Sequence, residues 1–361
     1  MKSKAGKDQH STAAGRGKHL RRSGFLRIMG AGMVAGGAAL GRGEGRAREQ
    51  AAPGAGAELK PSGAGEGGHT PPDEFSIGIL TDCQYADADT PANMPQRLYR
   101  RSPQKLVDAI AELTKQPGDL EFLLHMGDAI DRDESSFRVV VPLLKAAPAP
   151  VFQVAGNHDY SVADALKGRV AELLGMPSPY YVKDRGRWRF IFLDGNALSL
   201  FSSPAGSPGN LAAAEFRKGS KRKLEDYSGG LGETQRAWLR EQLAAARAGN
   251  QRVVMVCHYP LLPVDVHTLW DNEPVEALVE EFREVIVAWF NGHNHAGNYC
   301  ARHGIHFVNF RGMLDTGTNA FARADFYTDR IEITGHGREP SRTLKFPAPD
   351  APPEKPPVAG Y

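Results

Sequence analysis

Five apolar runs of this sequence each end in side chains that can bind a metal ion. The runs are rich in Ile, Val, Phe and Leu, which is typical of buried strands. They are 75–81, followed by Asp82 and Gln84; 122–126, followed by Asp128; 151–155, followed by Asn157 and His158; 253–257, followed by His258; and 285–291, followed by His293 and His295. Because ligands gather beyond the carboxyl ends of strands in α/β sheets, we expect these side chains to converge.

The joint pattern indicates a metal centre, although each residue alone has an ordinary explanation. A single Asp or Asn after a strand is usually a turn residue, and a single His is usually a hydrogen-bonded polar group. Carboxylate, amide and imidazole donors without thiolate suit Mn, Fe or Zn. Gly127, Gly156 and Gly292 precede the ligands and permit tight turns or close backbone approach.

The order of the motifs resembles that of the calcineurin-like metallophosphoesterases. Along residues 75–345 the chain has Asp-x-Gln, Gly-Asp-x-x-Asp, Gly-Asn-His-Asp, His and Gly-His-x-His. The resemblance implies an α/β fold, a four-layer α/β/β/α sandwich of two mixed sheets. It also implies a site for two divalent metal ions at the sheet edges.

The resemblance further implies a role for each motif residue. It assigns Asp82, Gln84 and His295 to one metal, Asn157, His258 and His293 to the other, and Asp128 to a bridge between them, with His158 as general acid and Asp131 as its orienting partner. The common family pattern has His where this chain has Gln84. A neutral amide is a weaker and harder ligand than imidazole, which favours Mn, or Fe, over Zn.

Segments outside the ligands are similar to those of the manganese-dependent ADP-ribose/CDP-alcohol diphosphatases. They are 82–89, 229–232 with Gln235, 312–316, and 335–338 with Pro340 and Arg342. Glutamine in the first motif is typical of that group, whereas Asp159 stands where its members have Glu. This similarity implies a hydrolase that cleaves the diphosphate of a small nucleotide conjugate.

The residue types suit hydrolysis of a phosphate ester or anhydride. Two metal ions about 3.5–4 Å apart can generate a hydroxide nucleophile and neutralise the phosphate oxygens. His158, with an unperturbed pKa of about 6.5, can protonate the leaving oxygen. A phosphomonoesterase, a cyclic-nucleotide phosphodiesterase and a non-catalytic metal-binding module remain alternatives for the same ligands.

Substrate contacts are less specified by the sequence. Arg132 either clamps a phosphate oxygen or is a surface arginine. Tyr85, Tyr299 and Trp270 either line a base-binding pocket or pack in the core or at its rim. We expect His125 inside its strand, and Cys83 and Cys257 beside the ligands, to be packing residues.

Charge separates the N-terminus from the body of the chain. The 361 residues carry 44 Lys+Arg and 42 Asp+Glu. Residues 1–50 hold 11 and 3 of these, a net of +8, which leaves 33 against 39, or −6, for the remainder. The body therefore gives no compositional indication of nucleic-acid binding.

The N-terminus resembles an export signal. Arg21 and Arg22 precede an uncharged run, 28–40, which is too short for a confident membrane span. We expect 1–50 to be an export signal of the twin-arginine type, or else an uncleaved anchor, so that the protein is periplasmic or extracellular and meets the membrane only in transit. Residues 51–74 are expected to be a linker, 75–346 the catalytic domain and 347–361 a Pro-rich disordered tail.

Two helices and one loop complete the predicted organisation. Ser102 and Pro103 predict an N-cap and first residue for one helix, and a second is expected over 234–246. Residues 199–228, rich in Pro, Gly and Ser, predict a long surface loop with a basic cluster over 217–223. That cluster is either simply solvated or attracts an anionic substrate.

Overall fold

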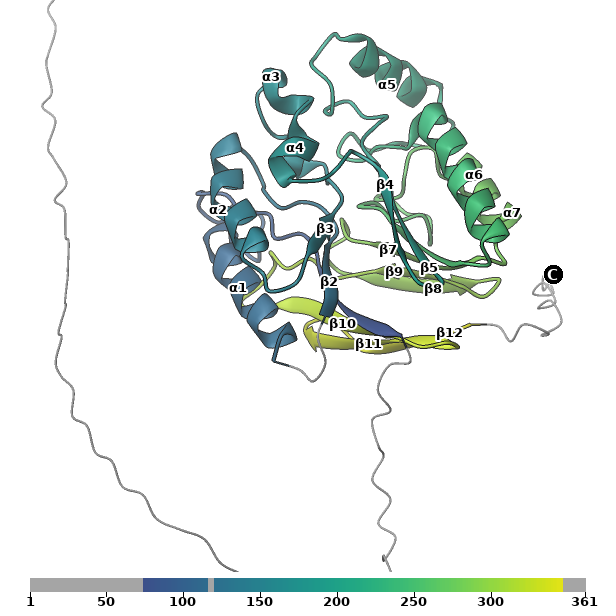
Figure 1. Ribbon diagram of the computed structural model, residues 1–361. Coiled ribbons are helices and arrows are strands. Elements are labelled where there is room, and N and C mark those ends of the chain that lie inside the picture. Colours follow the sequence, from purple (N-terminus) through teal and green to yellow (C-terminus); the bar gives the residue numbers. More distant parts are fainter. Residues whose placement is uncertain (1–73, 116–119, 347–361) are drawn as a thin grey trace, which may run out of the picture. The chain divides into compact units, whose positions relative to one another are not determined.

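A computed structural model describes residues 74–115 and 120–346 (Figure 1). The predicted export signal over 1–50, the linker before Glu74 and the Pro-rich tail from residue 347 lie outside these ranges. Within them, no helix has the length and apolar character that a membrane span requires.

The described residues form two six-stranded mixed sheets. The first sheet contains, in spatial order, β12 (Arg342–Lys345), β11 (Arg330–Gly337), β10 (Ala320–Phe326), β1 (Phe75–Leu80), β2 (Leu120–His125) and β3 (Val151–Gln153). The second contains β4 (Tyr181–Arg185), β5 (Trp188–Phe192), β6 (Arg252–Val256), β7 (Ile286–Asn291), β9 (Ile305–Asn309) and β8 (Asn298–Arg302). β1, β2 and β3 run parallel, as do β5, β6, β7 and β9.

Alternating side chains of both sheets meet in one apolar layer between them. Phe75 of β1 stacks on Phe326 of β10 with ring centroids 4.5 Å apart, and Trp188 of β5 meets Phe326 edge-on at 4.9 Å. These rings are buried, as are Phe122 and Phe190, which also meet edge-on. Successive side chains of a strand point to opposite faces of its sheet, so each sheet also has an outer apolar face that helices can cover.

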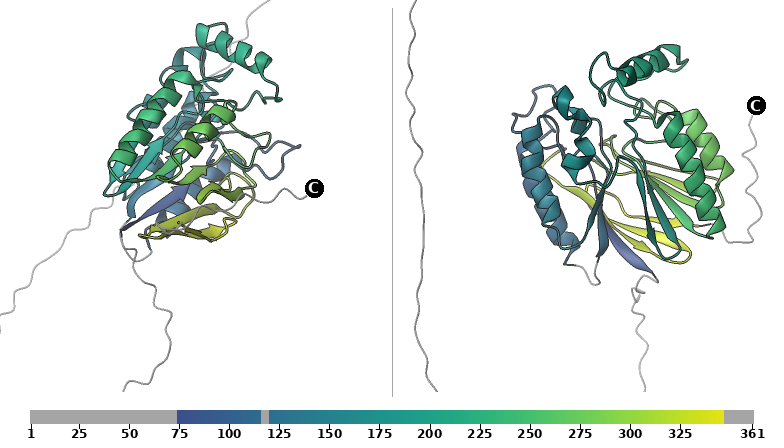
Figure 2. Two further views of the ribbon diagram at one scale, coloured as in Figure 1. Left: turned by 90° about the vertical axis from the view of Figure 1, so that its right-hand side faces the viewer. Right: turned by 45° about the horizontal axis from the view of Figure 1, so that its top comes forward.

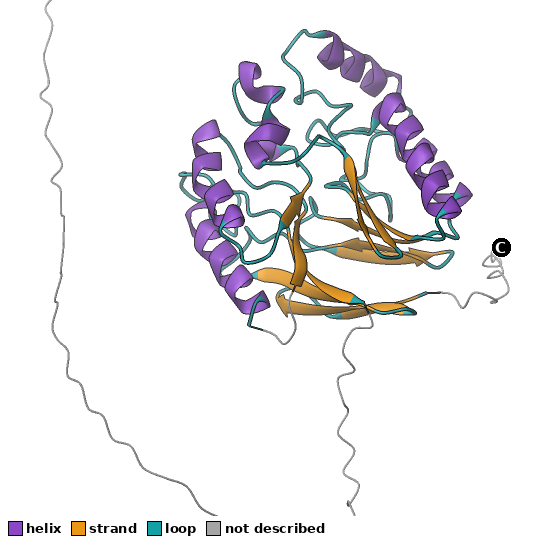
Figure 3. Ribbon diagram, viewed as in Figure 1, coloured by secondary structure: helices purple, strands orange, loops and turns teal. Residues whose placement is uncertain are grey.

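Helices cover both outer faces, which completes four layers (Figures 2 and 3). The first sheet is covered by α1 (Ser102–Leu113), α2 (Glu134–Lys145) and α4 (Val170–Leu174), with the short α3 (Asp164–Lys167) nearby. The second sheet is covered by α6 (Gly232–Ala248) and α7 (Asn272–Glu281). The predicted α/β/β/α sandwich of two mixed sheets is confirmed.

Two local predictions were wrong. The helix α1 has Arg101, not Ser102, at its N-cap, because a 3₁₀ turn, η1 (Tyr99–Arg101), already brings the chain into helical geometry. The segment 199–228 is not simply a loop, since it contains α5 (Pro208–Gly219), whose N-cap Ser207 accepts a hydrogen bond from the Asn210 amide. Ser-Pro before a run of alanines is a helix start that the surrounding Gly and Pro obscured.

Candidate metal centre

The carboxyl ends of five strands place all the predicted ligands together. The loops after β1, β2 and β3 come from one sheet, and those after β6 and β7 come from the other. Within each sheet, backbone hydrogen bonds tie neighbouring loops: the Gly292 amide donates to the His258 carbonyl, and the Asp82 amide donates to the Gly127 carbonyl. Between the sheets, the His293 amide donates to Oδ2 of Asp82 at 3.2 Å. The strand ends predicted from the apolar runs are therefore neighbours in space.

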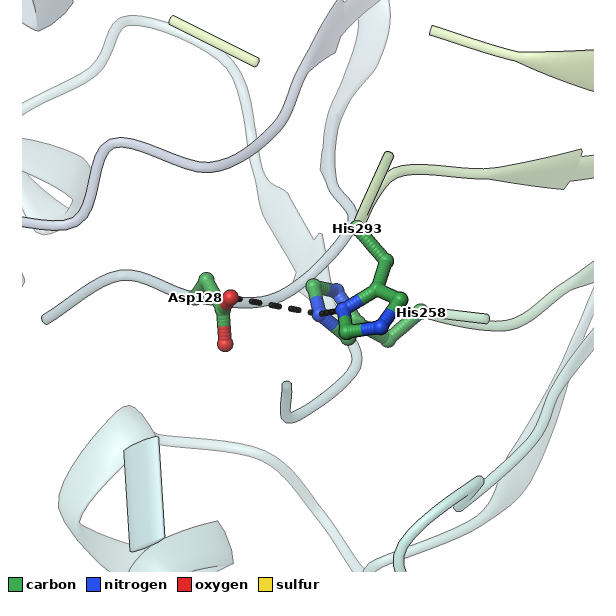
Figure 4. Close-up of side chains that lie close together, drawn as sticks. All are labelled: Asp128, His258 and His293. Atoms are coloured by element: carbon green, nitrogen blue, oxygen red, sulfur yellow. Dashed lines mark hydrogen bonds and ion pairs between the residues drawn. The ribbon is translucent and has the colours of Figure 1, made fainter. Parts of the chain in front are cut away.

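One half of the site is formed by Asp128, His258 and His293, whose ligand atoms lie within 4.8 Å of one another (Figure 4). Nε2 of His258 is 3.3 Å from Oδ2 of Asp128 and 3.2 Å from Nδ1 of His293. The Asn157 side-chain oxygen lies 3.2 Å from the same Nε2. Two imidazoles, an amide and a carboxylate thus face one point, as a divalent transition metal requires.

The other half contains Asp82, Gln84 and His295. Nε2 of His295 is 3.4 Å from Oδ1 of Asp82. The Gln84 side chain donates through Nε2 to Oδ2 of Asp128 at 2.9 Å, which joins the two halves. Oε1 of Gln84 is buried and has no hydrogen-bond partner among the described residues.

These observations fit a pair of divalent cations. A buried amide oxygen without a partner is costly unless something binds it. A cation beside Gln84 would satisfy that oxygen, and the carboxylates and imidazoles around it supply the remaining donors. The residues present can therefore hold two metal ions, with Asp128 between them.

Four of the predicted ligands have a left-handed backbone. The φ angles are 52° at Asp82, 44° at Gln84, 54° at Asp128 and 70° at His293. Residues other than glycine reach this region at a cost of about 1–3 kcal/mol, and such residues cluster at functional sites. The turns after the strands thus point these side chains toward the site, and the strained backbone there raises the free energy of the folded chain.

Asp159 holds two of these loops together. Its carboxylate accepts hydrogen bonds from the amides of Asp128, Ala129, Ile130 and Gly156 at 2.9–3.2 Å. Burial and the nearby Asp128 raise the pKa of Asp159 to about 7. A Cβ at Gly156 would collide with the Asp128 carboxylate, which explains the glycine there.

The charges of neighbouring ligands shift the pKa values of two histidines in the site. Burial alone would lower the pKa of His258, but the Asp128 and Asp82 carboxylates and the Met126 carbonyl together raise that pKa to about 9. Burial and the charge of His258 together hold the pKa of His293 well below its usual range. A divalent cation binds only deprotonated ligands, so it competes with the proton on His258.

His158 lies beside this cluster as a non-ligand candidate. Its backbone amide donates to Oδ1 of Asp128 at 2.9 Å, and its Nδ1 is 3.2 Å from Oδ1 of Asp131. Burial opposes the charged imidazole, but Asp128 and Asp131 raise the pKa of His158 above its usual value. Arg132 also pairs with Asp131, through Nη2 at 2.7 Å, so His158 and Arg132 share the Asp131 carboxylate.

The three aromatic residues predicted to line a base pocket are in different environments. Tyr85 is half-buried directly after Gln84, and its backbone pairs with that of Ile130. Trp270 is buried and donates to the Glu225 carbonyl, and Tyr299 stacks on His306 of the neighbouring strand. The contacts of Trp270 and Tyr299 do not support the predicted pocket.

Further residues lie near the ligands, and the sequence predicted some of them but not others. Cys83 and Cys257 are buried in the apolar core, as predicted, and His125 is buried within β2. Tyr227, which was not predicted, is half-exposed, and its ring centroid is 5.7 Å from that of His293. Within the basic cluster, Arg222 donates to the carbonyls of Asp265 and Leu269, so it caps a loop near the site.

Comparisons with known proteins agree with this geometry. The family model described as calcineurin-like phosphoesterase matches residues 75–297. The chain is 30% identical over 298 residues to the manganese-dependent ADP-ribose/CDP-alcohol diphosphatase of Arabidopsis thaliana, covering 73% of this chain and 94% of that protein. It is 26% identical over 318 residues to the Homo sapiens protein of the same name, covering 75% and 93%.

A solved structure shares the fold. A dimetal phosphatase from Danio rerio superposes with a TM-score of 0.67 at 23% identity, covering 76% of this chain and all of that chain. The match of the family model extends from β1 to just past His295, so it includes every predicted metal ligand. The chain therefore belongs to the calcineurin-like phosphoesterase family.

Proposed function

We propose that this protein is a manganese-dependent dinuclear hydrolase that cleaves the diphosphate of nucleotide conjugates such as ADP-ribose or a CDP-alcohol. The observation that carries the proposal is Gln84, whose amide bonds to Asp128 and leaves Oε1 available at the centre of an otherwise complete ligand set. The names of the relatives in Arabidopsis thaliana and Homo sapiens support the metal and the substrate class.

We assign the ligands in two groups that share Asp128. One metal would be held by Asp82, Gln84 and His295, and the other by Asn157, His258 and His293. When bound, two divalent ions activate water and stabilise negative charge on the phosphoryl oxygens. Asp128, which reaches both groups, fixes the spacing between them.

His158 would donate the proton to the departing oxygen. Because Asp131 lies at Nδ1, the ring keeps a proton there and Nε2 remains for the leaving group. Asp131 also stabilises the charged imidazole before transfer. A diphosphate departs as a phosphate monoester of low pKa, so its cleavage should depend less on His158 than cleavage of an alkyl ester does.

Arg132 and Tyr85 are the proposed substrate contacts. Arg132 is about half exposed although it pairs with Asp131, so its remaining donors can meet a phosphate oxygen. Tyr85 follows Gln84 directly and lies close to the proposed metal ligands.

The proposal is tested by measuring kcat/KM under matched Mn²⁺ for four substrates. They are ADP-ribose, CDP-choline, a cyclic mononucleotide and a phosphopeptide. We expect a diphosphate substrate to be preferred by at least about tenfold, or about 1.4 kcal/mol of transition-state discrimination. If the phosphopeptide or the cyclic nucleotide is preferred by that margin, the diphosphatase assignment is wrong and only the phosphoesterase family remains.

We also propose that the protein is exported by the twin-arginine route. The support is the pair Arg21 and Arg22 before the short apolar run 28–40. Replacing both arginines by lysine should retain the protein inside the cell, measured by fractionation. Replacing Arg46 and Arg48 by lysine is the matched control. Unchanged export of the Arg21 and Arg22 variant would contradict this route.

A further inference from the structure

A second carboxylate lies behind the proposed metal ligand His295. Oδ1 of Asp315 is 3.2 Å from Nδ1 of His295, and Nε2 of the same ring faces Oδ1 of Asp82 at 3.4 Å. Both atoms are buried and neither has a hydrogen-bond partner among the described residues, so the 3.2 Å approach between them is an ion-pair contact. We infer that Asp315 is a positioning residue that keeps the His295 proton on Nδ1 and Nε2 directed at the metal site. This inference rests on the ligand assignment proposed above.

The chemistry of imidazole explains the need for such a partner. A histidine that binds a metal through Nε2 must be neutral and must carry its proton on Nδ1. A carboxylate that accepts this proton fixes the tautomer and the ring orientation, and it makes the ligand more basic. Gln84 brings neither charge nor imidazole to the same half of the site. By making His295 a more basic ligand, Asp315 therefore partly offsets the weak metal binding of the neutral Gln84 amide.

The segment 312–316 is built to bring Asp315 close. A Cβ at Gly312 would lie 2.6 Å from Cγ of His295, so only glycine permits this approach. The Met313 amide donates to the Thr81 carbonyl at 3.0 Å, and the Leu314 amide donates to the Asp82 carbonyl at 2.9 Å. The backbone on which Asp315 stands is thus fixed to the ligand-bearing end of β1.

Lys105 of α1 secures the same segment from behind. Its side chain is buried, and Nζ donates to the carbonyl oxygens of Met313, Asp315 at 3.2 Å and Thr316 at 2.9 Å. A buried ammonium that donates to three carbonyls holds the backbone in one arrangement, because each lost bond would leave polar groups unpaired. Lys105 thereby limits the positions that the Asp315 carboxylate can take.

The test measures Mn²⁺ binding to apo-protein. Electron paramagnetic resonance gives the concentration of free Mn²⁺, and calorimetry gives the affinity of each site. Asp315→Ala should weaken one of the two Mn²⁺ sites about 10–100-fold and leave the other unchanged. Asp315→Asn should recover most of the loss, since an amide oxygen still accepts from Nδ1. Asn157→Ala should weaken the opposite site. Asp108→Ala, on the exposed face of α1, is the matched control and should change neither.

The outcomes separate this inference from the ligand assignment. Two wild-type affinities in Asp315→Ala would contradict the positioning role and leave the proposed function intact. Equal weakening of both sites, with a lowered Tm, would show that Asp315 is merely structural and would also overturn it. Lys105→Met provides a second variant, which should weaken the same site as Asp315→Ala. Wild-type protein that binds fewer than two Mn²⁺ would contradict the ligand assignment itself.

Discussion

The ligands around His258 and those around Gln84 are built from different donors. Around His258, two imidazoles lie beside Asp128 and the Asn157 amide lies beside His258, and loops after strands of both sheets supply them. Around Gln84 there is one imidazole, which has Asp315 at its second nitrogen. The nitrogen-rich half suits several transition metals, whereas the oxygen-rich half favours Mn²⁺. From this difference we expect the half around Gln84 to set most of the preference for Mn²⁺ over Zn²⁺.

Asp128→Asn should have the largest effect, because it removes the one charge that both halves share. We expect turnover to fall by about 10⁴-fold or more, since several kcal/mol of transition-state stabilisation depend on the metals, and metal retention to fall with it. Metal content after gel filtration and kcat with ADP-ribose measure both effects. Normal metal content in this variant would contradict the account, because both groups of ligands would then bind metal without the Asp128 charge.

His158→Ala should leave both halves intact. Its side chain contacts Asp131 rather than the proposed ligands, so both metals should remain while the rate falls by about 10²–10⁴-fold. The deficit should be smaller on ADP-ribose than on an alkyl phosphomonoester. Loss of metal from this variant would show that the acid and the ligands have been misassigned.

Gln84→His should make the two halves more alike. An imidazole in place of the amide should raise the affinity of that half for Zn²⁺ relative to Mn²⁺ by about tenfold. Competition between the two ions, followed by elemental analysis, measures the change. Gln104→His on the exposed side of α1 is the control. An unchanged ratio in Gln84→His would place the metal preference elsewhere.

Ser228→Ala should have the smallest effect. Ser228 Oγ lies 3.4 Å from Nε2 of His293, and a neutral hydroxyl bond of this kind contributes about 0.5–1.5 kcal/mol. We therefore expect less than about a tenfold change in the affinity of the His258 half, and no change in the Gln84 half. A loss as large as that of Asp315→Ala would mean that the hydroxyl and the carboxylate support their histidines equally.

Strand ends could be predicted from the sequence because two simple patterns coincide there. Apolar runs of strand length mark β1, β2, β3, β6 and β7, and a predicted ligand follows the end of each strand within about four residues. The order of the motifs resembles that of the calcineurin-like phosphoesterases, and that resemblance implied the fold, which is confirmed, and the assignment of the ligands, which stays a prediction.

What the sequence missed depends on packing between distant segments. Asp315 is 20 residues from His295 along the chain, and although it lies in the segment 312–316 that resembles the diphosphatases, nothing in the sequence pairs its carboxylate with that histidine. For Trp270 and Tyr299 the sequence left two alternatives, a base-binding pocket or packing, because their partners, Glu225 and His306, are defined only by the folded structure. Helix α5 was not predicted because its N-cap and first residue, Ser-Pro, lie within a stretch of Gly, Pro and Ser that is typical of a loop.

Reconstitution of apo-protein with single metals tests the central claim most directly. The oxygen-rich half around Gln84 predicts that metal-free protein is inactive and that Mn²⁺ restores most of the activity on ADP-ribose. Metal content and kcat/KM are measured together after adding Mn²⁺, Zn²⁺ or Fe²⁺ in turn. We predict two Mn²⁺ per active chain and poorer recovery with Zn²⁺. Equal or better recovery with Zn²⁺, with two tightly held zinc ions per chain, would contradict the account.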